Sequence, residues 1–391
     1  MLRILIAPDK FKGSLTSREV CDIVEKGLRL SSPDMDIISF PLADGGDGLL
    51  EIISYYTDAR VHKAGVANPL GKLVSSRWLL SSDGRTAFVE MAQASGLSLL
   101  QPAEYDCLLS STYGTGQLIG EAIRGGAKEI VIGIGGSATN DGGMGMAAAL
   151  GYRFLDEAGA ILPPCGGNLI RIRRIMVPEK KPWKDIRCRV ACDVRNPLCG
   201  PLGATRVYAP QKGADPAMVD QLEAGMLHYA EILKRELGMD VAEREGAGAA
   251  GGLGAGCMVF LQAELMRGVD LVIEYSGLEQ RVQDAEILIT GEGKIDDQTL
   301  QGKLVAGIAA LGRRYHKTVL AICGTLELPP DALREIGITA AFSIVNRPMT
   351  LEAALSRAPD LLQDMAFNIG GLLMGPGDLR GTEDLRGPKG S

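Results

Sequence analysis

Histidine is scarce in this chain. The 391 residues include only His62, His228 and His316, and none of them lies in a recognisable motif. Histidine is the side chain whose ordinary pKa lies nearest neutral pH, and it is the commonest general base in enzymes. Its scarcity disfavours chemistry built on a histidine base and leaves that work to carboxylates and lysines.

Other absences narrow the class of protein. The eight cysteines form no CxxC pair, and no histidine lies near the loose cluster of Cys188, Cys192 and Cys199, so we expect reduced thiols rather than a zinc site. No apolar run reaches the roughly 20 residues of a membrane span. The formal net charge of -7 offers no broad basic surface for nucleic acid. We therefore expect a cytoplasmic protein that binds neither membranes nor nucleic acid.

Glycine is plentiful, and its most informative use is the loop 133–143, between an apolar strand at 129–133 and a small-residue helix at 144–150. Glycines at a strand-to-helix turn let backbone N–H groups approach an anion, and the helix N-terminus adds positive potential. Hydroxyl, amide and carboxylate side chains lie between the glycines, and a loop that only turned the chain would not need them. We predict an anion-binding loop made of Gly135, Gly136, Ser137, Thr139, Asn140 and Asp141.

Three further turns place charged side chains at the ends of predicted strands. They contribute Lys10, Lys12 and Ser14; Asp44 and Asp47; and Glu292, Lys294 and Asp296. In open α/β sheets the carboxyl ends of the strands line the ligand crevice. Aspartates in such turns often bond only their own backbone. Repetition of the pattern favours phosphoryl transfer, which needs Mg²⁺ ligands, charge neutralisation and a phosphate cradle.

Asp193 ends an apolar segment, and Arg195 follows it. A carboxylate beside a guanidinium can be a plain salt bridge, and it can equally be a base or a metal ligand next to an oxyanion clamp. With histidine disfavoured, a carboxylate is the expected base, and Asp193 is our prediction for it, with Arg195 keeping it ionised. Asp44 and Asp296 are the alternatives for the base.

Two glycine segments match a dinucleotide-binding fingerprint. The first, Gly133–Ala138, follows a strand, and Asp156 stands near the expected ribose acid, but the helix does not begin within the fingerprint. In the second, Gly246–Gly251, close packing of small residues is the better explanation. Neither a Walker A motif nor the protein-kinase signature set is present. An NAD(P)-dependent oxidoreductase of small hydroxy acids and a non-catalytic nucleotide- or sugar-acid-binding regulator stay open as alternatives.

The order of predicted elements indicates an α/β fold. Strands at 3–7 and 36–42 alternate with helices, the first of which begins with the capping box Thr16–Glu19, and this rhythm is typical of a parallel sheet. Around Asp83 the pattern changes to a β-hairpin, 77–80 with 86–90. The α/β rhythm then returns.

Seven segments together resemble the bacterial glycerate kinase family that includes the glycerate 2-kinases. They occur in family order over roughly residues 1–375. The segments are Ala7–Leu15, Ala43–Gly48, Gly135–Gly143, Cys192–Leu198, Gln211–Asp215, Gly246–Gly254 and Gly291–Gln298.

The resemblance implies two α/β domains with parallel or mixed sheets and an active site in the cleft between them. It implies a discontinuous, Rossmann-like first domain of residues 1–64 plus 285–375, and an inserted α/β domain of residues 65–284. The tail 376–391, rich in glycine, proline and charge, is predicted to be disordered.

The resemblance also implies ATP- and Mg²⁺-dependent transfer of a phosphoryl group to D-glycerate, giving 2-phosphoglycerate. Asp193, Asp44 and Lys10 are the predicted catalytic residues, and Asp47, Glu292 and Asp296 the predicted metal ligands. The predicted substrate- and phosphate-binding residues outside the glycine loop are Lys12, Ser14, Arg195, Lys212 and Lys294. The position of the phosphorylated hydroxyl and the oligomeric state, a homodimer included, stay open.

Overall fold

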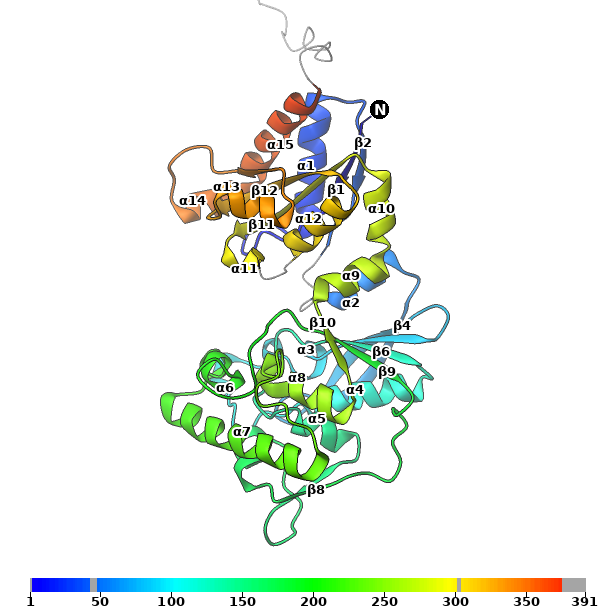
Figure 1. Ribbon diagram of the computed structural model, residues 1–391, viewed down its shortest axis with the longest axis vertical. Coiled ribbons are helices and arrows are strands. Elements are labelled where there is room, and N and C mark those ends of the chain that lie inside the picture. Colours follow the sequence, from blue (N-terminus) through cyan, green and yellow to red (C-terminus); the bar gives the residue numbers. More distant parts are fainter. Residues whose placement is uncertain (1, 43–47, 301–303, 375–391) are drawn as a thin grey trace, which may run out of the picture. The chain divides into compact units, whose positions relative to one another are not determined.

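The computed structural model of the chain describes residues 2–42, 48–300 and 304–374 (Figure 1). Two compact units divide them. One holds the described residues of Met1–Asp44 and Gly277–Ser391, and the other those of Gly45–Ser276. The chain therefore leaves the first unit after its second strand and returns to it for the C-terminal part. Each unit has its own sheet and core.

The sheet of the first unit has, within the described residues, five parallel strands in the order β13-β12-β11-β1-β2. Numbered along this unit alone, the order is 2-1-3-4-5, the flavodoxin-like form of the doubly wound α/β fold, whose switch point lies between the first and third strands. The predicted α/β class is confirmed. The elements are β1 (Arg3–Ile6), α1 (Ser17–Ser31), β2 (Asp36–Ser39), α10 (Leu278–Asp284), β11 (Ile287–Ile295), α11 (Asp297–Leu300), α12 (Leu304–Arg314), β12 (Thr318–Leu326), α13 (Pro330–Ile336), β13 (Ala340–Ser343), α14 (Leu351–Ser356) and α15 (Ala358–Met374).

Helix α1 shows how local sequence starts this unit. The Thr16 hydroxyl accepts a hydrogen bond from the Glu19 N–H, and the Glu19 carboxylate accepts one from the Thr16 N–H, at 3.2 and 2.8 Å. The predicted capping box is therefore confirmed. The buried face of α1 packs against α15, so that a helix near the start of the sequence and one near its end lie side by side (Figure 1). Gly27 permits this contact, since a Cβ there would lie 2.6 Å from the Gln363 carbonyl oxygen.

The sheet of the second unit is mixed, with the order β10-β9-β6-β5-β4-β3. Strands β5, β6, β9 and β10 are parallel, whereas β3, β4 and β5 form an antiparallel meander. The predicted hairpin is confirmed by the pairing of Leu79 with Phe88. The elements are α2 (Leu49–Tyr56), β3 (Arg60–Ala67), β4 (Leu73–Leu80), β5 (Thr86–Glu90), α3 (Ala92–Ser95), η1 (Leu97–Leu99), η2 (Pro102–Glu104), α4 (Tyr113–Arg124), β6 (Glu129–Gly133), α5 (Met144–Ala149), β7 (Arg153–Leu155), η3 (Gly166–Arg171), β8 (Arg174–Met176), β9 (Arg187–Ala191), α6 (Ala204–Tyr208), η4 (Pro210–Lys212), α7 (Pro216–Leu237), α8 (Ala249–Phe260), β10 (Glu264–Met266) and α9 (Gly268–Ser276).

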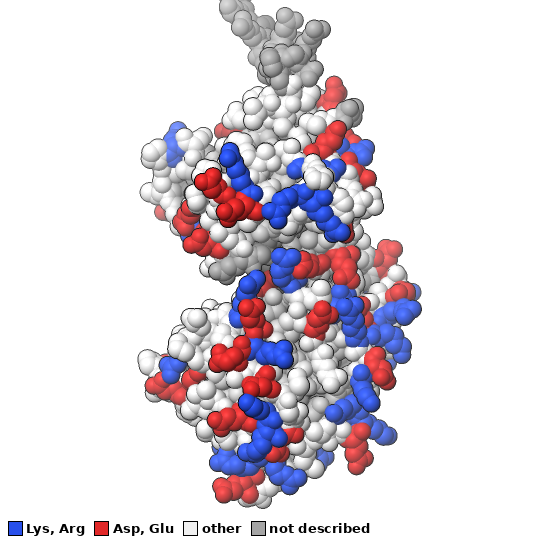
Figure 2. Space-filling model, in the orientation of Figure 1, with Lys and Arg blue, Asp and Glu red and all other residues white. Residues whose placement is uncertain are grey.

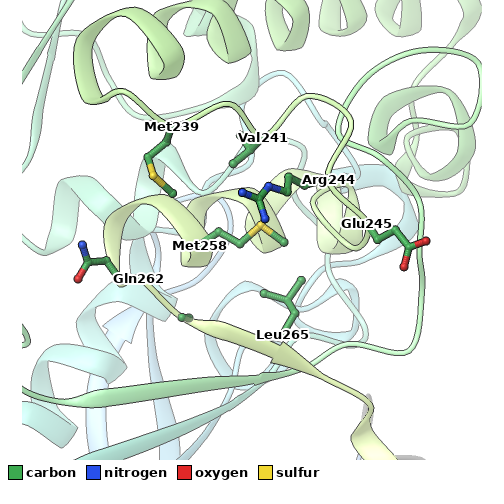
Figure 3. Close-up of a pocket in the computed structure, with 8 residues that line it drawn as sticks. Met239, Val241, Arg244, Glu245, Met258, Gln262 and Leu265 are labelled. Atoms are coloured by element: carbon green, nitrogen blue, oxygen red, sulfur yellow. The ribbon is translucent and has the colours of Figure 1, made fainter.

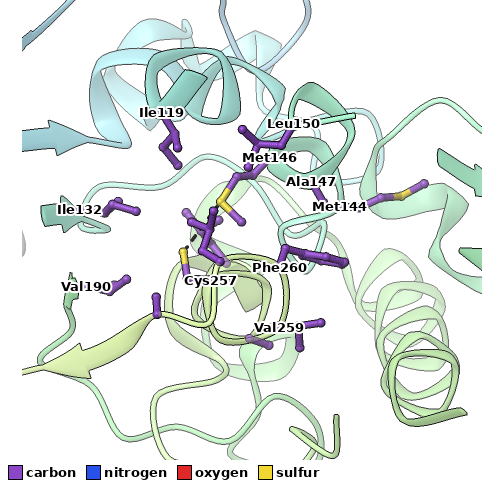
Figure 4. Close-up of a cluster of buried hydrophobic side chains, with 14 of the residues drawn as sticks. Ile119, Ile132, Met144, Met146, Ala147, Leu150, Val190, Cys257, Val259 and Phe260 are labelled. Carbon is purple, nitrogen blue, oxygen red and sulfur yellow. Dashed lines mark hydrogen bonds between the residues drawn. The ribbon is translucent and has the colours of Figure 1, made fainter. Parts of the chain in front are cut away.

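The core of this unit packs α4, α5 and α8 closely together (Figure 4). Met146 of α5 points at Cys257 of α8, whose thiol lies 3.9 Å from the methionine sulfur. Residues 250–252 have left-handed backbones, and the Gly142 N–H donates to the Gly251 carbonyl at 3.0 Å. The second glycine fingerprint therefore packs small residues against the loop 139–143, as the sequence indicated.

The predicted domain boundaries differ from the observed division. The boundary predicted after residue 64 falls inside β3, which pairs along its length with β4. Helix α2 also belongs to the second unit, because it packs on β5 and α9. The rhythm of strands and helices did not reveal which sheet α2 covers. The predicted tail 376–391 lies outside the described residues.

All eight cysteines are free thiols. Among the residues described, no helix combines the length and apolarity needed to cross a membrane. On the face shown in Figure 2, acidic and basic side chains are interspersed over the second unit. Neither sign of charge dominates that face.

Two glycines of α4, one turn apart, give a matched test of the packing. A Cβ on Gly116 would collide with the Met146 carbonyl of α5, whereas one on Gly120 would make only ordinary contacts with Arg124. We expect Gly116→Ala to lower the free energy of unfolding by about 1–3 kcal/mol, and Gly120→Ala to leave it unchanged or raise it by up to about 1 kcal/mol. Urea denaturation measures both. Equal effects would contradict the described packing.

Candidate active site

The first cluster of predicted residues lies at the switch point of the first unit. The Asp9 N–H donates to the Gly291 carbonyl at 2.8 Å, so the segment after β1 runs beside the end of β11. A Cβ on Gly293 would lie 3.2 Å from the backbone nitrogen of Lys12, so the two segments are in close contact. The structure thus brings the first and last of the predicted charged turns together, where doubly wound folds bind ligands.

A tight turn displays the lysines of this edge. The Phe11 N–H donates to the Leu15 carbonyl at 2.8 Å, and the side chains of both residues are buried. Lys10 and Lys12 are exposed. Ser14 donates to the Leu355 carbonyl at 3.5 Å. The two apolar anchors explain why the lysines of this motif face solvent.

The charged residues of this edge lie at the end of β11 and directly after it. Glu292 and Lys294 alternate along the strand, so their side chains point to the same side, and Asp296 follows the last residue of the strand. Thr299 joins the two acids, because its hydroxyl donates to Glu292 Oε1 at 2.7 Å and accepts from the Asp296 N–H at 3.2 Å. Sequence reasoning missed Thr299.

Lys294 is held as a cation at this edge. Its Nζ lies 2.9 Å from Glu327 and 3.3 Å from Asp296, and these hydrogen bonds, that of Glu327 first, raise the pKa of Lys294. Asp296 is thereby tied to Lys294 as well as to Thr299.

No group of three or more metal-ligating side chains occurs within the part of the chain that the structure describes. The carboxylates of Glu292 and Asp296 nevertheless suit Mg²⁺, which commonly uses one or two carboxylates, substrate phosphates and water. The predicted residues Asp44 and Asp47 lie outside the described residues.

The second cluster lies at the carboxyl edge of the second sheet. Four parallel strands end there in one row of paired residues, Glu90, Gly133, Ala191 and Met266. The glycine loop follows the second of these residues, and the Asp193 segment follows the third. Register therefore places the loop and Asp193 on neighbouring strand ends.

Asp141 supports the glycine loop from inside the protein. Its Oδ2 accepts hydrogen bonds from the Thr112 N–H and hydroxyl, both at 2.8 Å, and from the Gly145 N–H at 3.1 Å, while its Oδ1 accepts one from the Gly143 N–H at 3.1 Å. The side chain has no exposed surface, and burial raises the pKa of Asp141 against the effect of these bonds. The chain's own carboxylate thus takes the N–H groups at the start of α5, which the sequence had assigned to a ligand.

Thr139 and Asn140 are buried as well. The Asn140 amide donates to the Thr205 hydroxyl at 3.1 Å. The part of the loop that reaches the surface is its tip: Gly136 is exposed, and Gly135 and Ser137 are half-buried. A ligand would meet the loop at these three residues.

Lys212 lies behind this tip. Its Nζ donates to the Ser137 hydroxyl and to the Thr139 carbonyl, each at 2.7 Å. The tip is fastened on its other side, where the Leu97 N–H donates to the Gly136 carbonyl at 2.9 Å. The loop is therefore held from both sides before any ligand arrives.

The Asp193 side chain caps the N-terminus of α9. Its Oδ1 accepts from the N–H of Gly268, the first residue of α9, at 2.7 Å. Arg195 is exposed. Arg267 is the cation near Asp193. Its pKa is raised chiefly by Asp270 and to a smaller extent by Asp193. Arg189 of β9 holds α9 further along through an ion pair of 2.7 Å to Glu274, and it also pairs with Glu129 of β6 at 2.9 Å.

Glu90 is a carboxylate that sequence reasoning missed. It is only 6% exposed, and its Oε1 accepts from the Leu50 N–H in the first turn of α2 at 3.1 Å. The available signal was an acid that ends an apolar strand at a ligand-facing sheet edge. The hairpin prediction accounts for Glu90 only as the last residue of its second strand.

A separate hollow of about 540 Å³ lies between the α7–α8 connection and β10 (Figure 3). Methionine, valine and leucine side chains make up much of its wall, and Glu245 points away from the others. This lining does not match the donors that phosphoryl transfer requires.

Comparison with known proteins decides the family. The sequence model of the glycerate kinase family matches residues 4–374. The chain belongs to the glycerate kinase family. It is 44% identical to a glycerate 2-kinase of Escherichia coli K12 over 373 residues, which cover 95% of this chain and 98% of that protein. It is 45% identical to a glycerate kinase of Halalkalibacterium halodurans, over 94% of this chain and 97% of the relative.

A solved structure supports the same assignment. The crystal structure of a protein described as glycerate kinase 2 from Salmonella typhimurium LT2 matches with a TM-score of 0.81 and 42% identity, over 95% of this chain and 98% of that one. Membership of the family makes the protein a kinase. The resemblance seen in the sequence is confirmed, and the oxidoreductase and the non-catalytic regulator are ruled out.

The buried position of Asp141 predicts a stability effect. Asp141→Asn replaces an acceptor of four hydrogen bonds by a group that has fewer acceptor sites and two donors of its own. We expect the free energy of unfolding to fall by about 2–4 kcal/mol, because buried donors lose their partner. Asp185→Asn, at an exposed aspartate, is the control and is expected to change it by less than about 1 kcal/mol. Normal stability with lost ligand binding would instead make Asp141 a ligand residue.

Proposed function

We propose that this protein transfers the γ-phosphoryl group of ATP to D-glycerate, with Mg²⁺, and that the product is 2-phosphoglycerate. The observation that carries the proposal is the row of strand ends in the second unit, which sets the glycine loop beside Asp193. An anion-binding loop next to a carboxylate suits an acceptor that has both a carboxylate and a hydroxyl. The name of the Escherichia coli relative, glycerate 2-kinase, supports transfer to the 2-hydroxyl.

In the proposed reaction the glycerate hydroxyl oxygen forms a bond to the γ-phosphorus while the bond from that phosphorus to the bridging oxygen breaks, and ADP leaves. The hydroxyl proton passes to the Asp193 carboxylate. Arg195 and the loop tip, Gly135–Ser137, are the proposed partners of the glycerate carboxylate. Positive charge at this position favours the anionic substrate.

Binding of the nucleotide phosphates is assigned to the edge of the first unit. Lys10, Lys12, Ser14 and Lys294 are the proposed phosphate-binding residues. Glu292 and Asp296 would hold Mg²⁺, which neutralises charge on the phosphates when bound.

Asp193→Asn tests the proposed base. Asparagine keeps an oxygen that can accept from the Gly268 N–H, so we expect α9 and the thermal unfolding midpoint to be preserved. Loss of the carboxylate should lower kcat by about 10²-fold or more. The matched control is Asp270→Asn, in the first turn of the same helix, where Asp270 pairs with Arg267 at 2.7 Å. A coupled ADP-release assay with D-glycerate measures kcat, and NMR of the product identifies the phosphorylated hydroxyl. Near-normal kcat in Asp193→Asn would remove Asp193 from the role of base.

Thr299 tests the proposed metal site without removing a ligand. Thr299→Ala takes away the hydroxyl that holds the Glu292 carboxylate and the backbone of Asp296, and loss of such a supporting group typically weakens metal binding about 10–100-fold. We expect the Mg²⁺ concentration for half-maximal activity to rise by about that factor, while Thr299→Ser keeps the wild-type requirement. An unchanged requirement in Thr299→Ala, or full wild-type activity in excess EDTA, would refute the assignment.

A further inference from the structure

Lys212 is a buried cation without a carboxylate partner. Its side chain is only 1% exposed, and both oxygens that Nζ contacts, the Ser137 hydroxyl and the Thr139 carbonyl, are uncharged. No Asp or Glu oxygen in the described ranges lies within ion-pair distance of it. Burying an unpaired charge is costly. Packing alone therefore does not explain a buried lysine at this position.

The chain around Lys212 directs it inward. Gly213 has a φ of +91°, and a Cβ there would lie 2.7 Å from the Cβ of Tyr105. Asp215 then caps α7 by accepting from the Met218 N–H at 2.8 Å. The turn at Gly213 and the start of α7 together fix Lys212 at the end of η4. The motif Gln211–Asp215 thus places one lysine under the glycine loop.

On the side of Ser137 away from Lys212, the tip of the glycine loop lies at the protein surface. Because the Ser137 oxygen accepts a hydrogen bond from Lys212, its own O–H is left to donate elsewhere. No acceptor among the described residues takes the N–H groups of Gly136 and Ser137. The exposed tip therefore offers two backbone N–H groups and one hydroxyl, with an ammonium directly behind the hydroxyl.

We propose that Lys212 is a positioning residue. Its ammonium group supplies positive charge to the buried side of the glycine loop, and through its hydrogen bond to Ser137 it makes residues 135–137 a binding site for an anionic oxo group. That group is the carboxylate of the hydroxy acid or a phosphate of the nucleotide. The inference rests on the proposed function for the identity of these ligands. Lys212 acts through Ser137 rather than on the reacting atoms.

The pH dependence follows from the surroundings of Lys212. Burial lowers the pKa of Lys212 to about 8, although Cys107 and Asp141 act to raise it. Cys107 lies in the segment before α4, and its thiol contacts the Lys212 carbonyl at 3.3 Å; Asp141 lies in the loop. Tyr229 of α7, whose pKa is raised by burial and by Asp141, stays neutral over this range.

Two effects of opposite sign result. Anion affinity needs the ammonium, so it falls as pH rises above about 8, approaching tenfold per pH unit. Stability behaves in the opposite way, because the pKa in the folded state lies below the ordinary value of 10.5. The lysine's contribution to stability is full above the ordinary pKa and is lost as pH falls through the folded-state pKa.

The test is calorimetric titration of the wild type and of Lys212→Met with D-glycerate, ATP and inorganic phosphate, between about pH 7 and pH 9.5. Methionine has similar length and no charge. We expect the wild-type Kd for one ligand class to rise about tenfold from pH 8.5 to pH 9.5. Lys212→Met should bind that class at least about tenfold more weakly at pH 7, with no such pH dependence, and should be at least as stable there. An effect on D-glycerate alone assigns the carboxylate, and one on ATP and phosphate assigns the phosphate.

Lys180→Met, at an exposed lysine, is the matched control and should behave as wild type. Ser137→Ala provides a second variant should Lys212→Met not fold: because it removes the hydroxyl through which Lys212 acts, it should weaken binding of the same ligand class and reduce the pH dependence. Wild-type affinity in either folded loop variant, or an unchanged pH dependence in Lys212→Met, overturns the inference. Wild-type protein that binds none of the three ligands overturns both the inference and the proposed function, whereas pH-dependent binding without ADP release overturns the function alone.

Discussion

The carboxylate of Asp141 is the interaction on which the edge of the second sheet depends. Four hydrogen bonds join it to Thr112, at the start of α4, and to Gly143 and Gly145, at the start of α5. These bonds fix the inner end of the glycine loop to two helices of the core. The exposed tip can then have a defined shape without a ligand, because its inner end cannot move independently of that core.

Glycine packing completes this arrangement from the side of α8. A Cβ on Gly251 would collide with the Thr139 carbonyl, and one on Gly252 would lie 2.8 Å from the Gly142 Cα. Left-handed backbone at Ala250, with φ of 53°, is unfavourable for a residue that has a Cβ. The chain tolerates this strain where it brings two backbones into contact beneath the loop. Two segments that both look like nucleotide fingerprints in the sequence therefore have different roles, one at the surface and one as its support.

The sequence predicted the features that depend on neighbouring residues. Strand β6, the capping box of α1 and the hairpin at Asp83 all follow from local patterns. It also showed that charged turns end several strands, which parallel pairing then aligns. It did not show that Asp141 points inward, because its partner Thr112 is 29 residues away and has no local signal. The domain boundaries were misplaced for the same reason, since the sheet that α2 covers is fixed by contacts with distant strands.

The central claim is that the tip of the glycine loop, and not the start of α5, meets the anionic ligand. Amide NMR of the full-length protein, with ¹⁵N-glycine labelling and assignment by single substitutions, tests it most directly. On titration with D-glycerate or ATP, the account predicts large shifts of the Gly135 and Gly136 signals and little change at Gly143 and Gly145, whose N–H groups are held by Asp141. Shifts confined to Gly143 and Gly145, with Gly135 and Gly136 unmoved at saturation, would contradict it.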